Sequence, residues 1–175
     1  MKFLQISGAI FTIIVGTLLH FTYHLSGDNP IAAVFSAANE STWEHLKLLV
    51  MPILFFGIIE YFAYGNQTAN FIPVKTLSVL FGMATIVTAF YTYVGIAGKN
   101  YLWADIGTFI VGVIAAYLFS AYFLDTNYFS SPTAIILAWV GIIIIFACFV
   151  IFTFSPPHIG LFLDPVSNTY GVARK

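Results

Sequence analysis

The chain has 175 residues, of which 60% are hydrophobic and only 7% are charged, and its net charge is −1. Soluble domains carry roughly 25% charged residues, so six basic and seven acidic side chains are too few for a water-covered surface of this size. Nucleic-acid binding is excluded because no basic run is present to neutralise phosphates. Composition therefore predicts an integral membrane protein whose surface is covered mainly by lipid.

Five segments are long and apolar enough to cross a bilayer, which requires about 20 apolar residues in a helix. They lie at about 5–25, 44–64, 74–97, 103–124 and 132–154, separated by polar turns that contain Gly, Asn or Pro. The first segment exceeds the apolar core of a signal peptide, so we predict a membrane helix that is retained. The sequence predicts an all-α integral membrane bundle of about five transmembrane helices, forming a single domain over residues 1–175.

The connection between the first two spans, at about 28–43, is the only long one. Its middle, Pro30–Ala38, is apolar but too short to span a bilayer. Pro30 follows Asp28-Asn29, which suits a helix start with proline in the first turn. We therefore predict a short interfacial or re-entrant helix between the first two spans. The tail after residue 155 contains the apolar stretch Ile159–Leu163, and we expect it to pack back onto the helices.

The four histidines are predicted to gather at one face of the membrane. His20 and His24 are four residues apart at the end of the first span, so they share a helix face. His45 begins the second span and His158 follows the fifth. With five spans these three chain positions lie on the same membrane side. All four are candidate ligands for zinc or a similar divalent metal, which imidazole binds well.

Three carboxylates, Glu40, Glu44 and Asp164, are predicted on the same side as the histidines. They are the candidate catalytic residues, as general bases or as acceptors that orient the ligand histidines. Each feature also has a structural interpretation. Glu44 follows Ser41 by three residues, which is a capping box, and Asp164 precedes a proline, as in an ordinary turn. The histidines at the end of the first span can extend to the interface without binding anything. The sequence leaves a metal site and scattered interfacial polar residues both open.

Other polar residues of the spans have ordinary interpretations. Glu60 lies near the far end of the second span, where interfacial solvation is expected and a proton relay is the alternative. Asp105 falls in the first turn of the fourth span, where the helix dipole favours a carboxylate. Tyr91 and Tyr93 suit the interfacial aromatic belt, although either phenol can also reach the predicted site. Cys148 lies in an apolar run and is expected to be a packed or lipid-facing thiol.

The chain resembles a family of small bacterial multi-pass membrane proteins of unknown function. The resemblance covers the whole chain and rests on three stretches, namely Asn39-Glu40-Ser41-Thr42-Trp43-Glu44-His45-Leu46-Lys47, Ser155-Pro156-Pro157-His158 and Phe162-Leu163-Asp164-Pro165. It implies a multi-pass protein of a bacterial cell membrane and brings no activity with it.

The histidine pattern also has a looser similarity to seven-helix membrane hydrolases such as alkaline ceramidases and adiponectin-type receptors. In those proteins three histidines from different helices hold a zinc ion near one membrane face. The similarity implies that His20 or His24, together with His45 and His158, plays that part, with Asp164 or Glu40 nearby. The spans number about five rather than seven and the histidine spacing differs, so the likeness concerns chemistry alone.

These observations lead to three hypotheses of function. The first is a membrane-embedded metal-dependent hydrolase acting on a lipid or lipid-linked substrate, with Glu40 or Glu44 as general base. The second is a proton- or ion-coupled transporter, supported by Pro52, Glu60 and the broken loop segment. The third is a non-catalytic membrane partner or sensor whose histidines respond to pH or metal. The substrate, the orientation in the membrane and the oligomeric state stay open.

Overall fold

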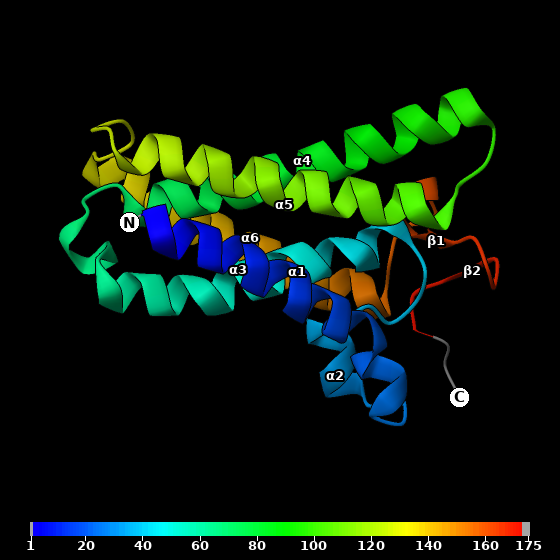
Figure 1. Ribbon diagram of the computed structural model, residues 1–175. Helices are drawn as coiled ribbons and strands as arrows, with labels where there is room; N and C mark the ends of the chain where they lie inside the picture. Colours follow the sequence, from blue (N-terminus) through cyan, green and yellow to red (C-terminus); the bar gives the residue numbers. More distant parts are fainter. Residues whose placement is uncertain (1, 173–175) are drawn as a thin grey trace.

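The computed structural model describes residues 2–172, which form helices and one small hairpin near the C-terminus (Figure 1). The long helices are α1 (Lys2–Leu25), α3 (Thr42–Ala63), α4 (Phe71–Ala97), α5 (Leu102–Leu124) and α6 (Pro132–Phe154). The shorter elements are α2 (Pro30–Phe35), the 3-10 turns η1 (Gly65–Gln67) and η2 (Gly160–Phe162), and the strands β1 (Leu163–Asp164) and β2 (Thr169–Tyr170). The predicted all-α bundle is confirmed, and the expected boundaries of the spans agree to within about three residues.

All five long helices have the length and composition needed to cross a membrane, so the chain is a multi-pass membrane protein. The side chains are distributed accordingly. Large apolar residues such as Ile14 and Ile143 face outwards, whereas Glu44 and Lys47 are buried inside the bundle. Apolar groups outside and charges inside are expected when hydrocarbon is the solvent. Glu60, expected to be solvated at the interface, is instead fully buried in the bundle, so that expectation is wrong.

Successive long helices run in opposite directions, and this brings distant parts of the chain to the same end of the bundle. Figure 1 shows the end of α1, the start of α3 and the end of α6 at one end, with the N-terminus at the other. We call the first the histidine end, because His20, His24, His45 and His158 belong to it. The opposite end, which contains Lys2, is the far end. The predicted gathering of the histidines at one membrane face agrees with this topology.

Glycines mark the places where the helices approach most closely. A Cβ atom added at Gly16 of α1 would collide with the carbonyl oxygen of Leu48 in α3. One added at Gly112 of α5 would overlap Ile86 of α4. Small residues allow the backbones of membrane helices to pack closely, which replaces the hydrophobic driving force that lipid cannot supply. These contacts fix α1 on α3 and α4 on α5.

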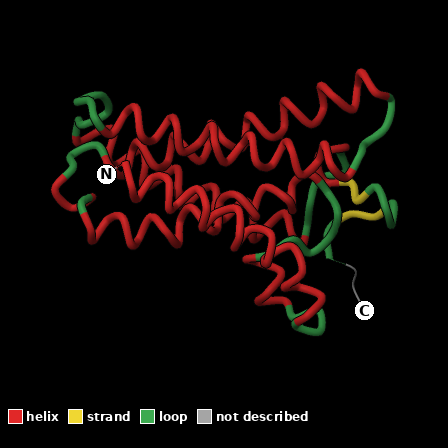
Figure 2. The backbone as a smooth tube through the Cα atoms, viewed as in Figure 1, coloured by secondary structure: helices red, strands yellow, loops and turns green. Residues whose placement is uncertain are grey.

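The short helix α2 is the predicted element between the first two spans. Its N-cap is Asn29, whose side-chain oxygen accepts a hydrogen bond from the amide of Ile31 at 2.8 Å, and Pro30 occupies the first turn. The helix ends at Phe35, inside the apolar stretch Pro30–Ala38. Figure 2 shows α2 as a separate helical piece beside the end of α1, joined by loops to α1 and α3.

A fully buried lysine, Lys47 of α3, holds α2 in place. Its Nζ donates hydrogen bonds to the carbonyl oxygens of Ala33 at 2.7 Å and Ser36 at 3.3 Å, which end α2. The same Nζ contacts Glu44 Oε2 at 2.7 Å and Thr153 Oγ1 at 2.5 Å. Thr153 in turn donates to Glu44 Oε1 at 2.9 Å. These five residues, the Lys47 network, connect α2, α3 and α6.

The C-terminal segment packs back onto the histidine end, as predicted. The amide of Val172 donates to the carbonyl oxygen of Thr153 at 3.0 Å. The side chain of Val172 packs against a small buried cluster of Tyr23, Ala33 and Ala38. The segment therefore covers the loop between α2 and α3 and restricts its movement.

Candidate metal centre at the histidine end

Three potential metal ligands converge at the histidine end: His20 from the end of α1, Glu40 from the loop before α3, and His45 from the first turns of α3. Glu40 Oε1 lies 3.9 Å from His20 Nε2, and Glu40 Oε2 lies 3.5 Å from His45 Nε2. The ligand atoms of all three residues lie within 4.8 Å of one another, the one such group found among residues 2–172. The side chains are 29%, 44% and 33% exposed in chain order, so solvent reaches the group.

The backbone fixes which nitrogen of His45 faces Glu40. His45 Nδ1 lies 2.9 Å from the carbonyl oxygen of Ser41. A carbonyl oxygen only accepts hydrogen bonds, so Nδ1 carries the proton. In the neutral ring the Nε2 lone pair then points toward Glu40. A backbone carbonyl that binds the second ring nitrogen is the usual arrangement for a histidine that ligates a metal.

His20 completes the group from the opposite side. Its ring lies 5.1 Å from the ring of His45 and contacts Phe21 edge-on at 4.8 Å. His20 Nδ1 is buried and has no hydrogen-bond partner among the described residues, so the polar contacts of the ring are on the Nε2 side. Without a cation, the free Nε2 of His45 and the Glu40 carboxylate would be two acceptors facing each other. A bound proton or a metal ion satisfies both.

The cluster is slightly wider than a site that holds a small divalent ion. Zinc binds imidazole nitrogen and carboxylate oxygen at about 2.0–2.2 Å, which places tetrahedral ligand atoms about 3.4 Å apart. His45 Nε2 lies 3.5 Å from one oxygen of Glu40, and His20 Nε2 lies 3.9 Å from the other. Because the three ligand atoms are spread over as much as 4.8 Å, the side chains must close in by up to about 1.4 Å to hold an ion. Two histidines and a glutamate with an open fourth position form the ligand set of several catalytic zinc sites. The partial exposure of the group leaves that fourth position accessible to water.

The loop that carries Glu40 is anchored on both sides. Asn39 Oδ1 accepts a hydrogen bond from the amide of Ser41 at 2.9 Å, and Asn39 Nδ2 donates to the carbonyl oxygen of Gly171 at 3.0 Å. The amide of Ala38 donates to Glu44 Oε2 at 2.8 Å. Glu40 is therefore an exposed side chain on a restrained backbone, which suits a ligand that must be preorganised.

Three of the predicted site residues make other contacts. His24 Nδ1 lies 3.2 Å from Asp28 Oδ1, one helical turn away from the cluster. The ring of His158 stacks on Tyr170 of β2 with centroids 4.4 Å apart. Asp164 accepts hydrogen bonds from the Val166 amide at 2.8 Å and the Ser167 hydroxyl at 2.7 Å, as in the turn expected for it. None of the three belongs to the cluster of His20, Glu40 and His45.

Glu44, the remaining candidate, belongs to the Lys47 network. Its side chain is only 2% exposed, and both carboxylate oxygens bind donors within the protein. The capping box is half formed, because Ser41 Oγ accepts from the amide of Glu44 at 3.3 Å. The Glu44 carboxylate binds the amide of Ala38 rather than that of Ser41. Its role in this structure is to stabilise the start of α3.

A second carboxylate lies beside the cluster. Asp105, in the first turn of α5, accepts hydrogen bonds from the phenol of Tyr93 and from Asn100 Nδ2, the latter at 3.2 Å. It is close enough to His45 for their charges to interact. Tyr93 therefore donates to Asp105 rather than to the histidines. Sequence spacing offers no signal for this contact, since it depends on how α4 and α5 meet the start of α3.

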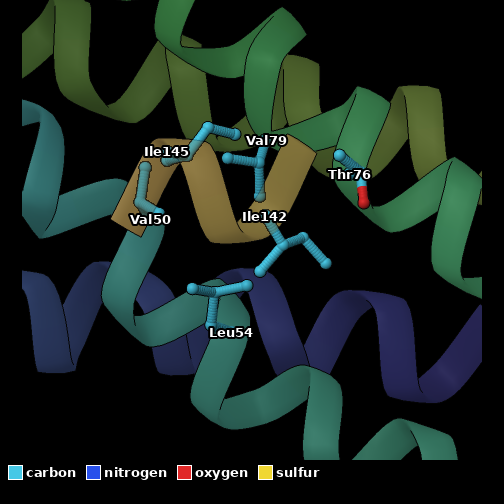
Figure 3. Close-up of a pocket in the computed structure, with 6 residues that line it drawn as sticks. All are labelled: Val50, Leu54, Thr76, Val79, Ile142 and Ile145. Atoms are coloured by element: carbon cyan, nitrogen blue, oxygen red, sulfur yellow. The ribbon is translucent and has the colours of Figure 1, made fainter. Parts of the chain in front are cut away.

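The bundle also contains a small apolar cavity between α3, α4 and α6. Figure 3 shows its lining, which is Val50, Leu54, Thr76, Val79, Ile142 and Ile145. The open space accommodates at most about one water-sized sphere. This cavity is therefore too small to hold a lipid substrate.

The fold and this geometry define a multi-pass helical membrane protein with a histidine–carboxylate cluster at one end. Residues 1–172 match the model of a family described as a family of unknown function (DUF6512), and the chain belongs to that family. The match over almost the entire length agrees with the family resemblance of the sequence. No curated protein and no solved structure shows significant similarity to the chain.

Proposed function

We propose that this protein is a metal-dependent hydrolase embedded in the cell membrane and acting on a lipid or lipid-linked substrate. Its metal, zinc or a similar divalent ion, would be held by His20, Glu40 and His45. The observation that carries the proposal is the convergence of these three side chains within 4.8 Å, with the tautomer of His45 set by a backbone carbonyl. The partial exposure of the group leaves one coordination position for water or substrate.

A divalent ion in such a site supplies two effects: it polarises a carbonyl or phosphoryl oxygen, and it lowers the pKa of a bound water to about 7. The protein supplies the geometry. His45 is oriented by Ser41, and Glu40 is presented by the anchored loop. His20 approaches from a different helix, so the site depends on the packing of α1 against α3.

The proposal assigns proton transfer to the exposed Glu40 carboxylate rather than to Glu44. Each Glu40 oxygen faces a different histidine, so one oxygen can bind the ion while the other accepts a proton. Glu44 is unsuited to this part, because it is 2% exposed and its oxygens bind Lys47, Thr153 and a backbone amide.

A lipid is the substrate class that suits the surroundings of the site. The helix ends at this face carry large exposed apolar side chains, including Phe21 on α1 and Leu102 and Trp103 on α5. Phe21 directly contacts the ring of His20. An amphiphile lying along these side chains would keep its chains in hydrocarbon while its ester or amide group reaches the polar cluster.

The test is hydrolysis of ester- and amide-linked lipids in mixed micelles, with products identified by mass spectrometry. We expect turnover that a chelator abolishes and added zinc restores. Activity should be lost in His45→Ala and Glu40→Gln and retained in His158→Ala, a matched control in which a histidine outside the cluster is replaced. Turnover that survives chelation, or that persists in His45→Ala, would contradict the proposal. Stoichiometric metal without turnover on either lipid class would favour a sensor instead.

A further inference from the structure

A second group of charged and polar side chains is buried at the far end, remote from the histidines. Glu60 Oε1 accepts hydrogen bonds from Gln5 Nε2 at 2.6 Å and from the Tyr64 hydroxyl at 2.7 Å. Glu60 Oε2 pairs with Lys75 Nζ at 2.5 Å. The Lys75 ammonium also lies over the ring of Tyr117, 5.1 Å from its centroid. This far-end network connects α1, α3, α4 and α5, with Glu60 fully buried and Lys75 only 6% exposed.

A shallow cleft at the far end reaches Gln5 of this network. Its lining is Lys2, Gln5, Ala121, Leu124 and Asp125. Gln5 belongs both to the cleft and to the far-end network. Its Nε2 donates a hydrogen bond to Glu60, and its Oε1 accepts one from Lys75 Nζ at 3.4 Å. Gln5 therefore links the cleft to the buried ion pair.

An unsatisfied hydroxyl lies in the same region of α5. Ser120 Oγ is buried and has no hydrogen-bond partner among the described residues. Residues three and four apart on a helix share a face, so Ser120 lies on the stripe that runs from Tyr117 in the network to Leu124 in the cleft. A buried hydroxyl without a partner usually indicates a place for water. Ser120 is thus a buried polar group between the cleft and Tyr117.

Comparison with the Lys47 network shows why the far-end network is different. Lys47 Nζ has two backbone carbonyls among its four oxygen partners, and neither cavity described above borders the network. The Lys47 network therefore has a structural role, which is to hold α2 against α3 and α6. Glu60, by contrast, is bound entirely by side chains, two of which carry exchangeable protons of their own, Tyr64 and Lys75. Side-chain partners can rearrange when the carboxylate gains a proton, whereas backbone carbonyls fixed by helices cannot.

We propose that Glu60 is a proton-exchange site, which equilibrates with the aqueous phase at the far end through the cleft at Gln5. A proton from hydronium in the cleft forms an O–H bond at the Glu60 carboxylate, leaving water behind. The Glu60–Lys75 ion pair is thereby lost, and the network gains one positive charge. The Lys75 ammonium keeps its contacts with Gln5 and the Tyr117 ring. The proposal is independent of the metal centre.

The titratable and charged groups that face Glu60 are Lys75 and Tyr64, with Tyr117 behind Lys75. At the mouth of the cleft are Lys2 and Asp125, one of each sign. In a membrane protein, a buried carboxylate that is paired and reachable from one side is the arrangement used by proton relays. The activity implied is proton binding at a defined depth from one face, as in a proton-coupled carrier.

Infrared difference spectroscopy of the full chain in lipid nanodiscs, stepped across about pH 4 to 8 where protein carboxyls and histidines titrate, tests the proposal. We expect a carbonyl band of a protonated carboxylic acid that is lost in Glu60→Gln. The band should remain in Glu44→Gln and Glu40→Gln, the matched controls at the other end of the bundle. Ala121→Phe, which fills the cleft without touching the ion pair, should leave the band at equilibrium but slow its appearance after a pH jump.

If Glu60→Gln does not fold, Tyr64→Phe tests whether the carboxylic acid band belongs to Glu60. Loss of the phenol removes one hydrogen bond to the ionised carboxylate, so the band should appear at higher pH than in the wild type. Absence of any titrating carboxylic acid band, or a band unaffected by both Glu60→Gln and Tyr64→Phe, would overturn the assignment to Glu60. An unchanged rate in Ala121→Phe would overturn the cleft as the route.

Discussion

Replacing Lys47 by methionine tests how the short helix and the loop that carries Glu40 are held. Lys47 and Glu44 are 0% and 2% exposed, and their charged atoms are 2.7 Å apart. Removing one partner of a buried ion pair costs about 3–5 kcal/mol, because the other charge stays buried without compensation. Glu44 keeps hydrogen bonds from Ala38 and Thr153. We therefore expect Lys47→Met to lower the free energy of unfolding by about 3 kcal/mol, the lower limit of that range.

The size of this loss separates an ion pair from an ordinary hydrogen bond. Side-chain hydrogen bonds between membrane helices average only about 0.6 kcal/mol. A double replacement, Lys47→Met with Glu44→Gln, removes both charges and should cost less than the sum of the single variants. Residues in direct contact show coupling energies of about 0.5–3 kcal/mol.

Equilibrium unfolding in detergent micelles with increasing denaturing detergent measures all three variants. Limited proteolysis of the segment at 28–41 reports whether α2 is released when Lys47 is lost. Metal binding should weaken in parallel, since the loop then presents Glu40 less rigidly. A loss below about 1 kcal/mol for Lys47→Met, or strict additivity of the two replacements, would refute the reasoning.

Three further predictions follow from the same contacts. Zinc affinity should fall as the solution is acidified, because ligand imidazoles must be neutral to bind the ion. Calorimetric titration checks this, and an affinity that stays constant down to about pH 5 would contradict histidine ligation. Asn39→Ala should weaken zinc binding and remove about 1–2 kcal/mol of stability, because two hydrogen bonds of the loop are lost; unchanged zinc affinity would contradict the role given to the loop. Gly112→Ala should lower the free energy of unfolding by about 1–3 kcal/mol, because the added Cβ overlaps Ile86. Gly107→Ala is the control and should be neutral, because a Cβ added there meets nothing within 4 Å. Equal losses of stability in the two variants would argue against the close packing of α4 and α5.

The membrane spans were predictable because hydrocarbon allows few solutions. A stretch of about 20 apolar residues must satisfy its backbone groups internally, so it forms a helix. The start of α3 was marked in the sequence by Ser41, which caps it, and the end of α4 by Gly98, whose φ of 72° suits glycine. The short helix α2 covers only Pro30–Phe35 of the apolar stretch Pro30–Ala38. The reason is that the following residues bind Glu44 and Lys47 instead of continuing the helix.

The candidate site was predictable only in part. An odd number of spans brings the histidines to one end, but which of them converge depends on helix rotation and on the path of the C-terminal segment. His20 and His45 meet because α1 packs closely on α3 at Gly16. His158 departs with the segment after α6 and stacks on Tyr170.

The far-end network shows a similar limit. Glu60 and Lys75 lie near the same end of the consecutive spans α3 and α4, a signal that pairing was possible. Their burial could not be read from the sequence, because it is produced by Gln5 and Tyr117 on two other helices. Long-range packing, rather than local pattern, decides whether a charge near a helix end is solvated or enclosed.

Metal content measured by elemental mass spectrometry tests the central claim most directly, using untagged protein purified in detergent without added metal. The account predicts about one equivalent of zinc or a similar divalent ion per chain, lost in His20→Ala, His45→Ala and Glu40→Gln and kept in His24→Ala and His158→Ala. Absence of metal even after reconstitution with zinc at neutral pH would contradict the account. Equal retention of metal in all five variants would contradict it as well.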